Sequence, residues 1–336
     1  MQRRRLGSNG PLVSPIGLGC MGMSGIYGPA SRAESLATLR AATDAGIDWL
    51  DTGDFYGMGH NELLIGEHLK GTARERMTIS VKFGAMRDAA GGWLGFDGRP
   101  AAVKNFLAYS LQRLGLDYID IYRPARLDPL VPIEDTVGAI ADMIKAGYVR
   151  HVGLSEVGAK TIRRAAAVHA ICDLQIEYSL VSRGIETQVL PACRELGIGI
   201  TAYGVLSRGL LSGRWSAGPN QPNDMRAHMP RFQAANLAHN LDLVEVLRRL
   251  AAERGASVAE IAIAWVIAQG ADIFPVLGAR RRDQLAEALR ALKLRLEPQD
   301  LASIEAAVPP GSAAGERYAS AQMAHLDSER ERYGDA

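Results

Sequence analysis

The chain has 336 residues, which is enough for one large domain with a sizeable buried core. Apolar residues make up 47% and charged residues 22%, and the formal charge is +1, so neither a basic surface for nucleic acid nor a strongly acidic one is expected. Three cysteines without C-x-x-C spacing argue against a disulfide framework and favour a reducing compartment such as the cytoplasm. No apolar run is long enough to cross a bilayer, so we expect a soluble protein with a small-molecule partner and no membrane partner.

Short apolar runs alternate with longer amphipathic runs along the chain. The expected strands are PIGLG (15–19), DWLDT (48–52), TISVKFG (78–84), YIDIYRP (118–124), VRHVGLS (149–155), DLQIEYS (173–179), GITAYGV (199–205) and DIFPVLG (272–278). Helical patterns between them, several ending in glycine, include 32–46, 101–115, 133–147 and 185–197. Eight strands joined by helical crossovers predict an α/β fold, a closed (β/α)8 TIM barrel.

Segments outside this alternation of strands and helices predict additions to the barrel. Asn9-Gly10 between two short runs predicts a β-hairpin that caps one end. The Pro-, Asn- and Gly-rich stretch 215–232 predicts either a lid at the active-site end or a disordered excursion. Two helices are expected before the last strand, and the second, AEIAIAWVIAQG, is apolar all round and predicts core. We expect one barrel domain over 1–311 and a tail over 312–336 that either lines the pocket or is partly disordered.

The segment GLGCMG, 17–22, matches the G-x-G-x-x-G fingerprint of dinucleotide-binding Rossmann folds. That motif requires a helix to begin at its third glycine, but MSGIYGP follows here. We therefore interpret the glycines as a loop close to a ligand rather than as a Rossmann site.

Three residues at expected strand ends carry acid chemistry. Asp51 ends the second strand, Tyr56 follows it, and Lys82 lies within the apolar third strand. A lysine inside a barrel needs a carboxylate partner, and Asp51 is one strand away. An ammonium near Tyr56 would lower the pKa of its phenol, so we expect Tyr56 to be a proton donor near neutral pH.

These residues belong to motifs that resemble, in order and spacing, the aldo-keto reductase family over residues 3–310. The motifs are GLGCMGMSG, LDTGDFYG, SVKFG, HVGLSEV, LQIEYSL, AYGVLSRGLLSG and PVLGARRRDQLAEA. GLSE and EYSL are similar to the bacterial and plant-type subgroup. The resemblance implies an NADPH-dependent (β/α)8 barrel that reduces aldehydes and ketones, with Asp51, Tyr56 and Lys82 as three members of a catalytic tetrad.

The resemblance also implies a cofactor site. Ser155 and Gln175 match positions that bind the nicotinamide carboxamide, and Tyr203 matches the ring that stacks on the nicotinamide. YGVLSRG departs from the usual YSPLGRG but keeps the loop that follows the pyrophosphate. The other expected cofactor residues in this part of the site are Met21, Asp51, Glu156 (where many members have Asn), Val205, Leu206, Ser207, Gly209 and Gly278.

The segment GARRRDQLAEA lies where the last strand meets its helix, and guanidinium groups there can bind a 2′-phosphate. We expect NADP rather than NAD, with Arg280 at the phosphate, Gln284 as a second contact and Glu287 at the adenine amino group. Ala288 replaces the family's usual Asn. An exposed basic start to the helix is the alternative, and no metal site is expected.

The segment IYRPARLDP, 121–129, departs from the family, because Ala125 takes the position that normally holds a histidine. Three interpretations of this alanine are open. The space that it leaves accommodates a bulkier ketone, a neighbouring donor replaces the imidazole, or the protein binds the cofactor with little turnover. Arg123 shares a strand face with Ala125 and could supply that donor or be structural, whereas Arg126 is expected to point away. His60 is a remote substitute.

The predicted function is NADPH-dependent reduction of a carbonyl compound to an alcohol, with Tyr56 as proton donor and without the usual histidine. The reverse reaction, oxidation of an alcohol, stays open. The alternative is an NADP(H)-binding regulatory or sensor protein of low activity. Tyr27, Trp93, Ala125 and Tyr318 are the candidate substrate-pocket residues, and a homo-oligomer is compatible with the sequence.

Overall fold

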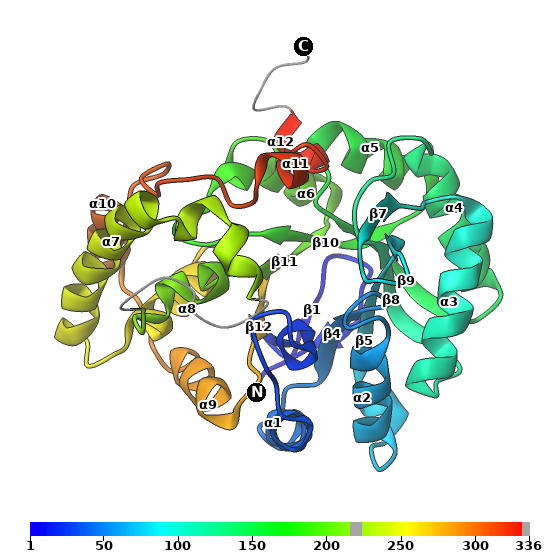
Figure 1. Cartoon of the computed structure of the whole chain (residues 1–336), viewed down its shortest axis with the longest axis horizontal. Coiled ribbons are helices and arrows are strands. Elements are labelled where there is room, and N and C mark those ends of the chain that lie inside the picture. Colours follow the sequence, from blue (N-terminus) through cyan, green and yellow to red (C-terminus); the bar gives the residue numbers. More distant parts are fainter. Residues whose placement is uncertain (216–223, 331–336) are drawn as a thin grey trace.

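Eight parallel strands close into a barrel at the centre of the computed structural model, which describes residues 1–215 and 224–330 (Figure 1). Their order around the barrel is β10-β11-β12-β3-β4-β5-β8-β9. The barrel strands are β3 (Gly17–Gly19), β4 (Trp49–Gly53), β5 (Thr78–Phe83), β8 (Ile119–Pro124), β9 (Val149–Ser155), β10 (Ile171–Glu177), β11 (Gly199–Tyr203) and β12 (Ile273–Gly278). Each coincides with one of the predicted runs, so the predicted (β/α)8 barrel is confirmed.

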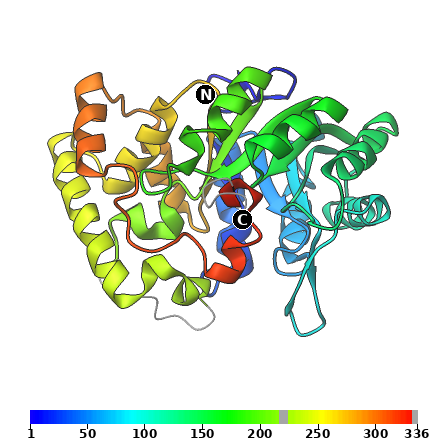
Figure 2. The same cartoon turned by 90° about the horizontal axis from the view of Figure 1, so that it is seen from above.

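Helices surround the barrel on its outer side (Figures 1 and 2). The α-helices are α1 (Arg32–Asp44), α2 (His60–Leu69), α3 (Pro100–Leu114), α4 (Ile133–Lys145), α5 (Ala159–Val168), α6 (Val189–Leu196), α7 (Ala234–Glu253), α8 (Val258–Ala268), α9 (Arg282–Ala291), α10 (Pro298–Ala307), α11 (Ser320–Met323) and α12 (Asp327–Arg330). The 3-10 helices are η1 (Met21–Ser24), η2 (Arg74–Arg76), η3 (Gly184–Glu186), η4 (Ser207–Ser212), η5 (Met225–His228) and η6 (Pro230–Phe232). Helix α8 begins with a capping box made by Ser257 and Glu260. Its residues from Val258 to Val266 are buried, as expected for a core helix.

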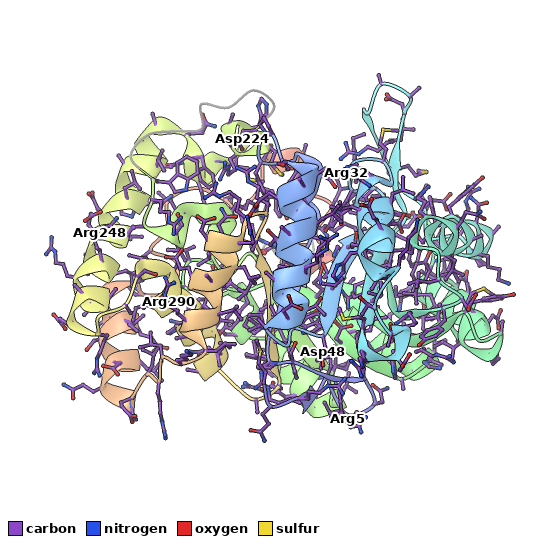
Figure 3. The ribbon with its side chains drawn as sticks, turned by 90° about the horizontal axis from the view of Figure 1, so that it is seen from below. Arg5, Arg32, Asp48, Asp224, Arg248 and Arg290 are labelled. Atoms are coloured by element: carbon purple, nitrogen blue, oxygen red, sulfur yellow. The ribbon has the colours of Figure 1, made fainter. Side chains whose placement is uncertain are left out.

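The N-terminal hairpin closes the end of the barrel at which the strands begin. Strands β1 (Arg4–Arg5) and β2 (Leu12–Val13) pair antiparallel, which confirms the predicted hairpin at Asn9-Gly10. Leu6 of this hairpin packs in one buried cluster with Trp49 and Phe274 of the barrel. Figure 3 shows Arg5 and Asp48 at this end and Asp224 at the other.

The carboxyl ends of the strands carry additions that the sequence pattern predicted in part. Strands β6 (Ala85–Arg87) and β7 (Trp93–Phe96) form a hairpin after β5 that was not predicted. Of the segment 215–232, residues 216–223 lie outside the described residues, and 224–232 contain the two short helices η5 and η6. The N–H of Met225 donates to the carbonyl of Ile26 (3.3 Å), so this segment contacts the loop after β3.

The loop after β3 has the form expected of a ligand loop rather than of a Rossmann motif. Met21–Ser24 forms a 3-10 turn, and an α-helix begins only at Arg32. No helix among the described residues is long and apolar enough to cross a membrane.

Candidate active site

An ion pair between two neighbouring strands lies at the carboxyl end of the barrel. Lys82 on β5 faces Gly53 on β4, and its Nζ lies 2.5 Å from Oδ1 of Asp51. Each side chain is only 5% exposed. Two charges so deeply buried are stable only together and with further hydrogen bonds.

Those further bonds come to the other oxygen of Asp51. Oδ2 accepts hydrogen bonds from Ser80 Oγ (3.0 Å), Arg123 (3.1 Å) and Gln175 Nε2 (2.7 Å). Burial alone would raise the pKa of Asp51, but Lys82 and Arg123 outweigh it and hold the pKa below its ordinary value. Asp51 is therefore a fixed anion that orients Lys82 and Gln175.

Arg123 lies beneath this layer and is fully buried. Its guanidinium joins Asp51 to Asp173, with NH2 at 2.6 Å from Asp173 Oδ2, and Thr201 Oγ1 donates to the same oxygen (2.6 Å). Arg123 is absent from the described lining of the pocket. These contacts favour its structural interpretation over a role as the replacement donor.

Tyr56 stands next to the ion pair, in the turn that follows β4. Its ring packs edge-on against Phe55, and Lys82 Nζ lies 5.3 Å from its ring centroid. Burial raises the pKa of Tyr56 well above its ordinary value, and the negative charge of Asp51 raises it further. The prediction of a lowered pKa was wrong, because it left out the burial of the phenol and the charge of Asp51, and both raise the pKa. The phenol therefore keeps its proton at neutral pH and is a hydrogen-bond donor.

Ala125 and Arg126 follow β8 at the edge of the same pocket. Ala125 is 2% exposed, and Arg126 reaches the lining with NH1 at 2.6 Å from the Ala125 carbonyl. The prediction that Arg126 points away was wrong, because β8 ends at Pro124 and its side-chain alternation does not continue beyond it. His60 is bonded to Ser24 and is absent from the described lining, so it does not replace the imidazole.

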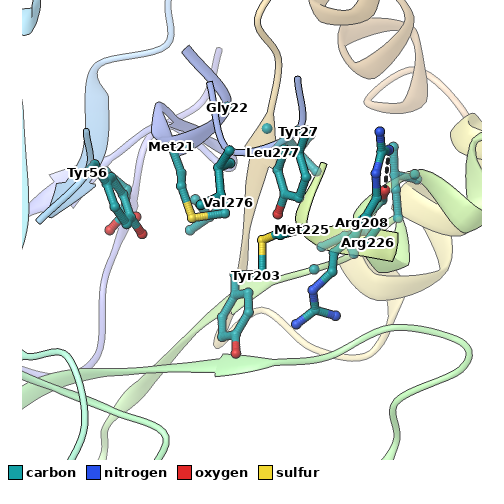
Figure 4. Close-up of a pocket in the computed structure, with 18 of the residues that line it drawn as sticks. Met21, Gly22, Tyr27, Tyr56, Tyr203, Arg208, Met225, Arg226, Val276 and Leu277 are labelled. Atoms are coloured by element: carbon teal, nitrogen blue, oxygen red, sulfur yellow. Dashed lines mark hydrogen bonds between the residues drawn. The ribbon is translucent and has the colours of Figure 1, made fainter. Parts of the chain in front are cut away.

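The pocket is a cavity of about 720 Å³ that runs from Tyr56 across the carboxyl ends of the strands to the start of α9. Figure 4 shows Tyr56 at one side, Arg208 and Arg226 at the other, and Met21 and Tyr203 between them. The other predicted residues that the structure brings to its lining are Tyr27, Asp51, Lys82, Trp93, Ser155, Gln175, Val205, Leu206, Gly209, Gly278, Arg280, Gln284, Glu287 and Tyr318.

Two predicted cofactor residues are absent from the described lining. Glu156 is fully buried, and its carboxylate accepts hydrogen bonds from Arg317 (2.5 and 2.8 Å) and from the Tyr203 hydroxyl (2.6 Å). Ser207 is also buried, with its Oγ at 3.3 Å from Arg231. Both were placed in the cofactor site by resemblance, but here their polar groups face the protein.

At the far end of the pocket, Arg280 meets the loop after β3. Its NH1 donates to the carbonyls of Tyr27, Gly28 and Pro29, and its backbone N–H donates to Gln284 Oε1 (3.1 Å). Nε and NH2 of Arg280 make no hydrogen bond to any other described residue, so they remain available to a ligand.

The two arginines that follow Arg280 are already paired. Arg281 pairs with Asp283 and Arg282 with Glu34. Glu287, the candidate for the adenine amino group, is bound by Arg214 (2.7 Å).

Several pocket residues were not predicted. Besides Tyr318, the C-terminal segment contributes Ala321, Gln322, His325 and Leu326 to the lining. Figure 1 shows α11 and α12 near α5, and Asp327 Oδ2 accepts from the N–H of Gly158 at the start of α5 (2.9 Å). The sequence signal that pointed here was Tyr318, an aromatic residue in an otherwise polar tail.

Comparison with known proteins agrees with this geometry. The model of the aldo/keto reductase family matches residues 15–309. "Probable aldo-keto reductase 1" from Glycine max is 41% identical over 323 residues, covering 95% of this chain and 92% of that protein. The structure of glycerol dehydrogenase AKR11B4 from Gluconobacter oxydans superposes with a TM-score of 0.82 at 26% identity, covering 92% of this chain and 96% of that one. The holo form of aldo-keto reductase AKR11C1 from Bacillus halodurans gives 0.76 at 26% identity, covering 94% and 98%. With a family model that spans most of the barrel and a relative matched over nearly its full length, the chain belongs to the aldo/keto reductase family.

Proposed function

We propose that the protein is an NADPH-dependent reductase that converts an aldehyde or ketone to an alcohol, with Tyr56 as the proton donor. Membership of the family and the barrel support a carbonyl-reducing oxidoreductase. The observation that carries the finer proposal is the Asp51–Lys82 ion pair beside Tyr56, at one side of a cavity that extends to Arg280.

The residues along this cavity fit a nicotinamide dinucleotide. Tyr203 offers a ring for stacking, and Ser155 and Gln175 offer polar groups for the carboxamide. The unused nitrogens of Arg280, near the start of α9, suit a 2′-phosphate. When bound, the reduced nicotinamide supplies the hydride.

The protein's own residues supply the proton and position the groups around the proton donor. The Tyr56 hydroxyl donates its proton to the carbonyl oxygen as negative charge develops there. Lys82 lies beside the ring, where its ammonium stabilises the phenolate that remains. Asp51 holds Lys82 in place through Oδ1 and Gln175 through Oδ2.

The experiment is NADPH oxidation with a panel of aldehydes and ketones by the wild type and by Tyr56→Phe. Loss of turnover in Tyr56→Phe with unchanged NADPH affinity would support the proposal. Tight NADPH binding without turnover of any carbonyl would instead favour a binding or sensor protein. The alanine at position 125, where the family has a histidine, also favours that second function.

A further inference from the structure

The corner of the pocket beside Tyr56 has an alanine where the family has a second hydrogen-bond donor. The methyl group of Ala125 cannot donate a hydrogen bond to a carbonyl oxygen. The nearest inward donors are engaged elsewhere, since Lys82 and Gln175 both bind Asp51 at 2.5 and 2.7 Å. Arg123 is likewise used by Asp51 and Asp173 and lies beneath the pocket.

Arg126 brings a cation into this corner. Its shortest contact is the Ala125 carbonyl (2.6 Å), while Ser155 Oγ and the Tyr318 hydroxyl lie at 3.5 Å. Burial and Asp51 raise the pKa of Tyr56, and the positive charge of Arg126 acts in the opposite direction. Burial lowers the pKa of Lys82, Asp51 raises it, and Arg126 adds to the lowering, so Arg126 acts on the acid and on its partner.

Arg126 also differs from two other half-buried arginines of the pocket lining, Arg208 and Arg226. Arg208 lies 2.8 Å from Glu177, and Arg226 lies 2.5 Å from Asp224. No carboxylate of the described residues lies within 4.0 Å of the Arg126 guanidinium. A cation in a pocket without a carboxylate partner leaves N–H groups for a ligand.

We propose that Arg126 donates the second hydrogen bond to the substrate's carbonyl oxygen and so replaces the missing imidazole. The inference rests on the proposed reductase function. In the reaction, hydride from the reduced nicotinamide forms the new C–H bond, the π pair of the C=O bond moves to oxygen, and that oxygen takes the Tyr56 proton. The guanidinium stabilises the charge that builds up on oxygen before the proton arrives. Because a guanidinium does not titrate in proteins, this donor is present at every pH at which the protein is folded.

The test compares single-turnover hydride transfer from NADPH to para-nitrobenzaldehyde in the wild type and in Arg126→Gln. We expect transfer to be slower by about a hundredfold, the typical loss for one donor to a developing oxyanion. NADPH affinity and the melting temperature should stay at wild-type values. Arg164→Gln removes a positive charge from an exposed pair with Glu134 and is the matched control. Arg126→Lys, which keeps the cation and is the milder change, should give an intermediate rate.

A double-mutant cycle with Ala125→His separates this role from a general electrostatic effect. If Arg126 fills the place of the imidazole, Ala125→His should restore transfer in Arg126→Gln by about tenfold or more and change the wild type little. Equal gains in both backgrounds, or transfer at the wild-type rate in Arg126→Gln, would overturn the inference.

Two further outcomes have a clear meaning. A loss in His325→Ala with none in Arg126→Gln would assign the donor to the exposed imidazole that faces Phe96 and would also overturn the inference. Absence of carbonyl turnover in the wild type itself would refute the proposed function, and the Arg126 inference with it.

Discussion

A buried arginine of the C-terminal segment, Arg317, binds a buried carboxylate at the carboxyl end of the barrel, and removing this arginine should destabilise the protein strongly. Arg317 is 7% exposed and donates to both oxygens of Glu156 (2.5 and 2.8 Å). Tyr203, Ser328 and the N–H of Glu177 also donate to this carboxylate. The substitution Arg317→Met keeps most of the side-chain volume and removes the charge.

The expected loss of unfolding free energy in Arg317→Met follows from the contacts that Glu156 keeps. Glu156 is fully buried, and breaking a buried pair by removing one partner costs about 3–5 kcal/mol. The hydrogen bonds from Tyr203 and Ser328 remain, so we expect the lower end, about 3 kcal/mol. Glu177 keeps Arg208 at 2.8 Å and adds little to the cost.

The assay is urea unfolding of the wild type, Arg317→Met, Glu156→Gln and the double variant. The double variant should lose at least about 1 kcal/mol less than the sum of the single variants, because it leaves no unpaired buried charge. Arg164→Met breaks an exposed pair at 2.7 Å and should cost less than about 1 kcal/mol. A loss in Arg317→Met no larger than in Arg164→Met would refute the reasoning.

Three further predictions concern pH and cofactor choice. Burial would raise the pKa of Glu156, but Arg317 outweighs this effect and holds the pKa well below the unfolded value of about 4.3. The stability that the Glu156 carboxylate contributes is therefore present above that pH and is lost as the pH falls below it. The stability difference between wild type and Glu156→Gln should be constant from about pH 5 to 8 and shrink in acid, and a difference that grows in acid would contradict this. Burial, with a contribution from Glu62, raises the pKa of Asp54 to about 7, so the folded state holds a proton that the unfolded state releases near about 3.9. Wild-type stability therefore falls as the pH rises between these values. In urea unfolding, the stability of Asp54→Asn relative to the wild type should rise from pH 5 to pH 8, and a constant difference would count against a buried protonated carboxyl. Arg280→Gln should weaken NADPH binding by about ten- to a hundredfold and leave NADH binding nearly unchanged, as measured by fluorescence titration, whereas equal losses for both nucleotides would remove Arg280 from the 2′-phosphate.

The barrel was predictable from sequence because most residues of its parallel strands are buried, so the strands are short runs rich in apolar residues. The run that contains Lys82 was recognised even with a lysine inside it, and that anomaly pointed to Asp51. The β6–β7 hairpin was missed because Asp88 to Gly92 and their neighbours have no alternation of apolar and polar residues.

The parts of the site that sequence did not predict depend on tertiary contacts. Arg126 was expected to point away because strand alternation was extended past the residue where the strand ends. Glu156 was expected near the cofactor, but Arg317, more than 150 positions later, binds its carboxylate. The pKa of Tyr56 was misjudged because the burial that raises it depends on how other segments pack around the phenol, which the sequence does not show.

The central claim is that Tyr56 protonates a carbonyl oxygen in a site that binds NADPH. The most direct test measures NADPH binding and carbonyl-dependent NADPH oxidation side by side in the wild type and in Tyr56→Phe. The account predicts equal NADPH affinity in both proteins and turnover only in the wild type. Turnover that persists in Tyr56→Phe, or tight NADPH binding with no turnover in the wild type across aldehydes and ketones, would contradict it.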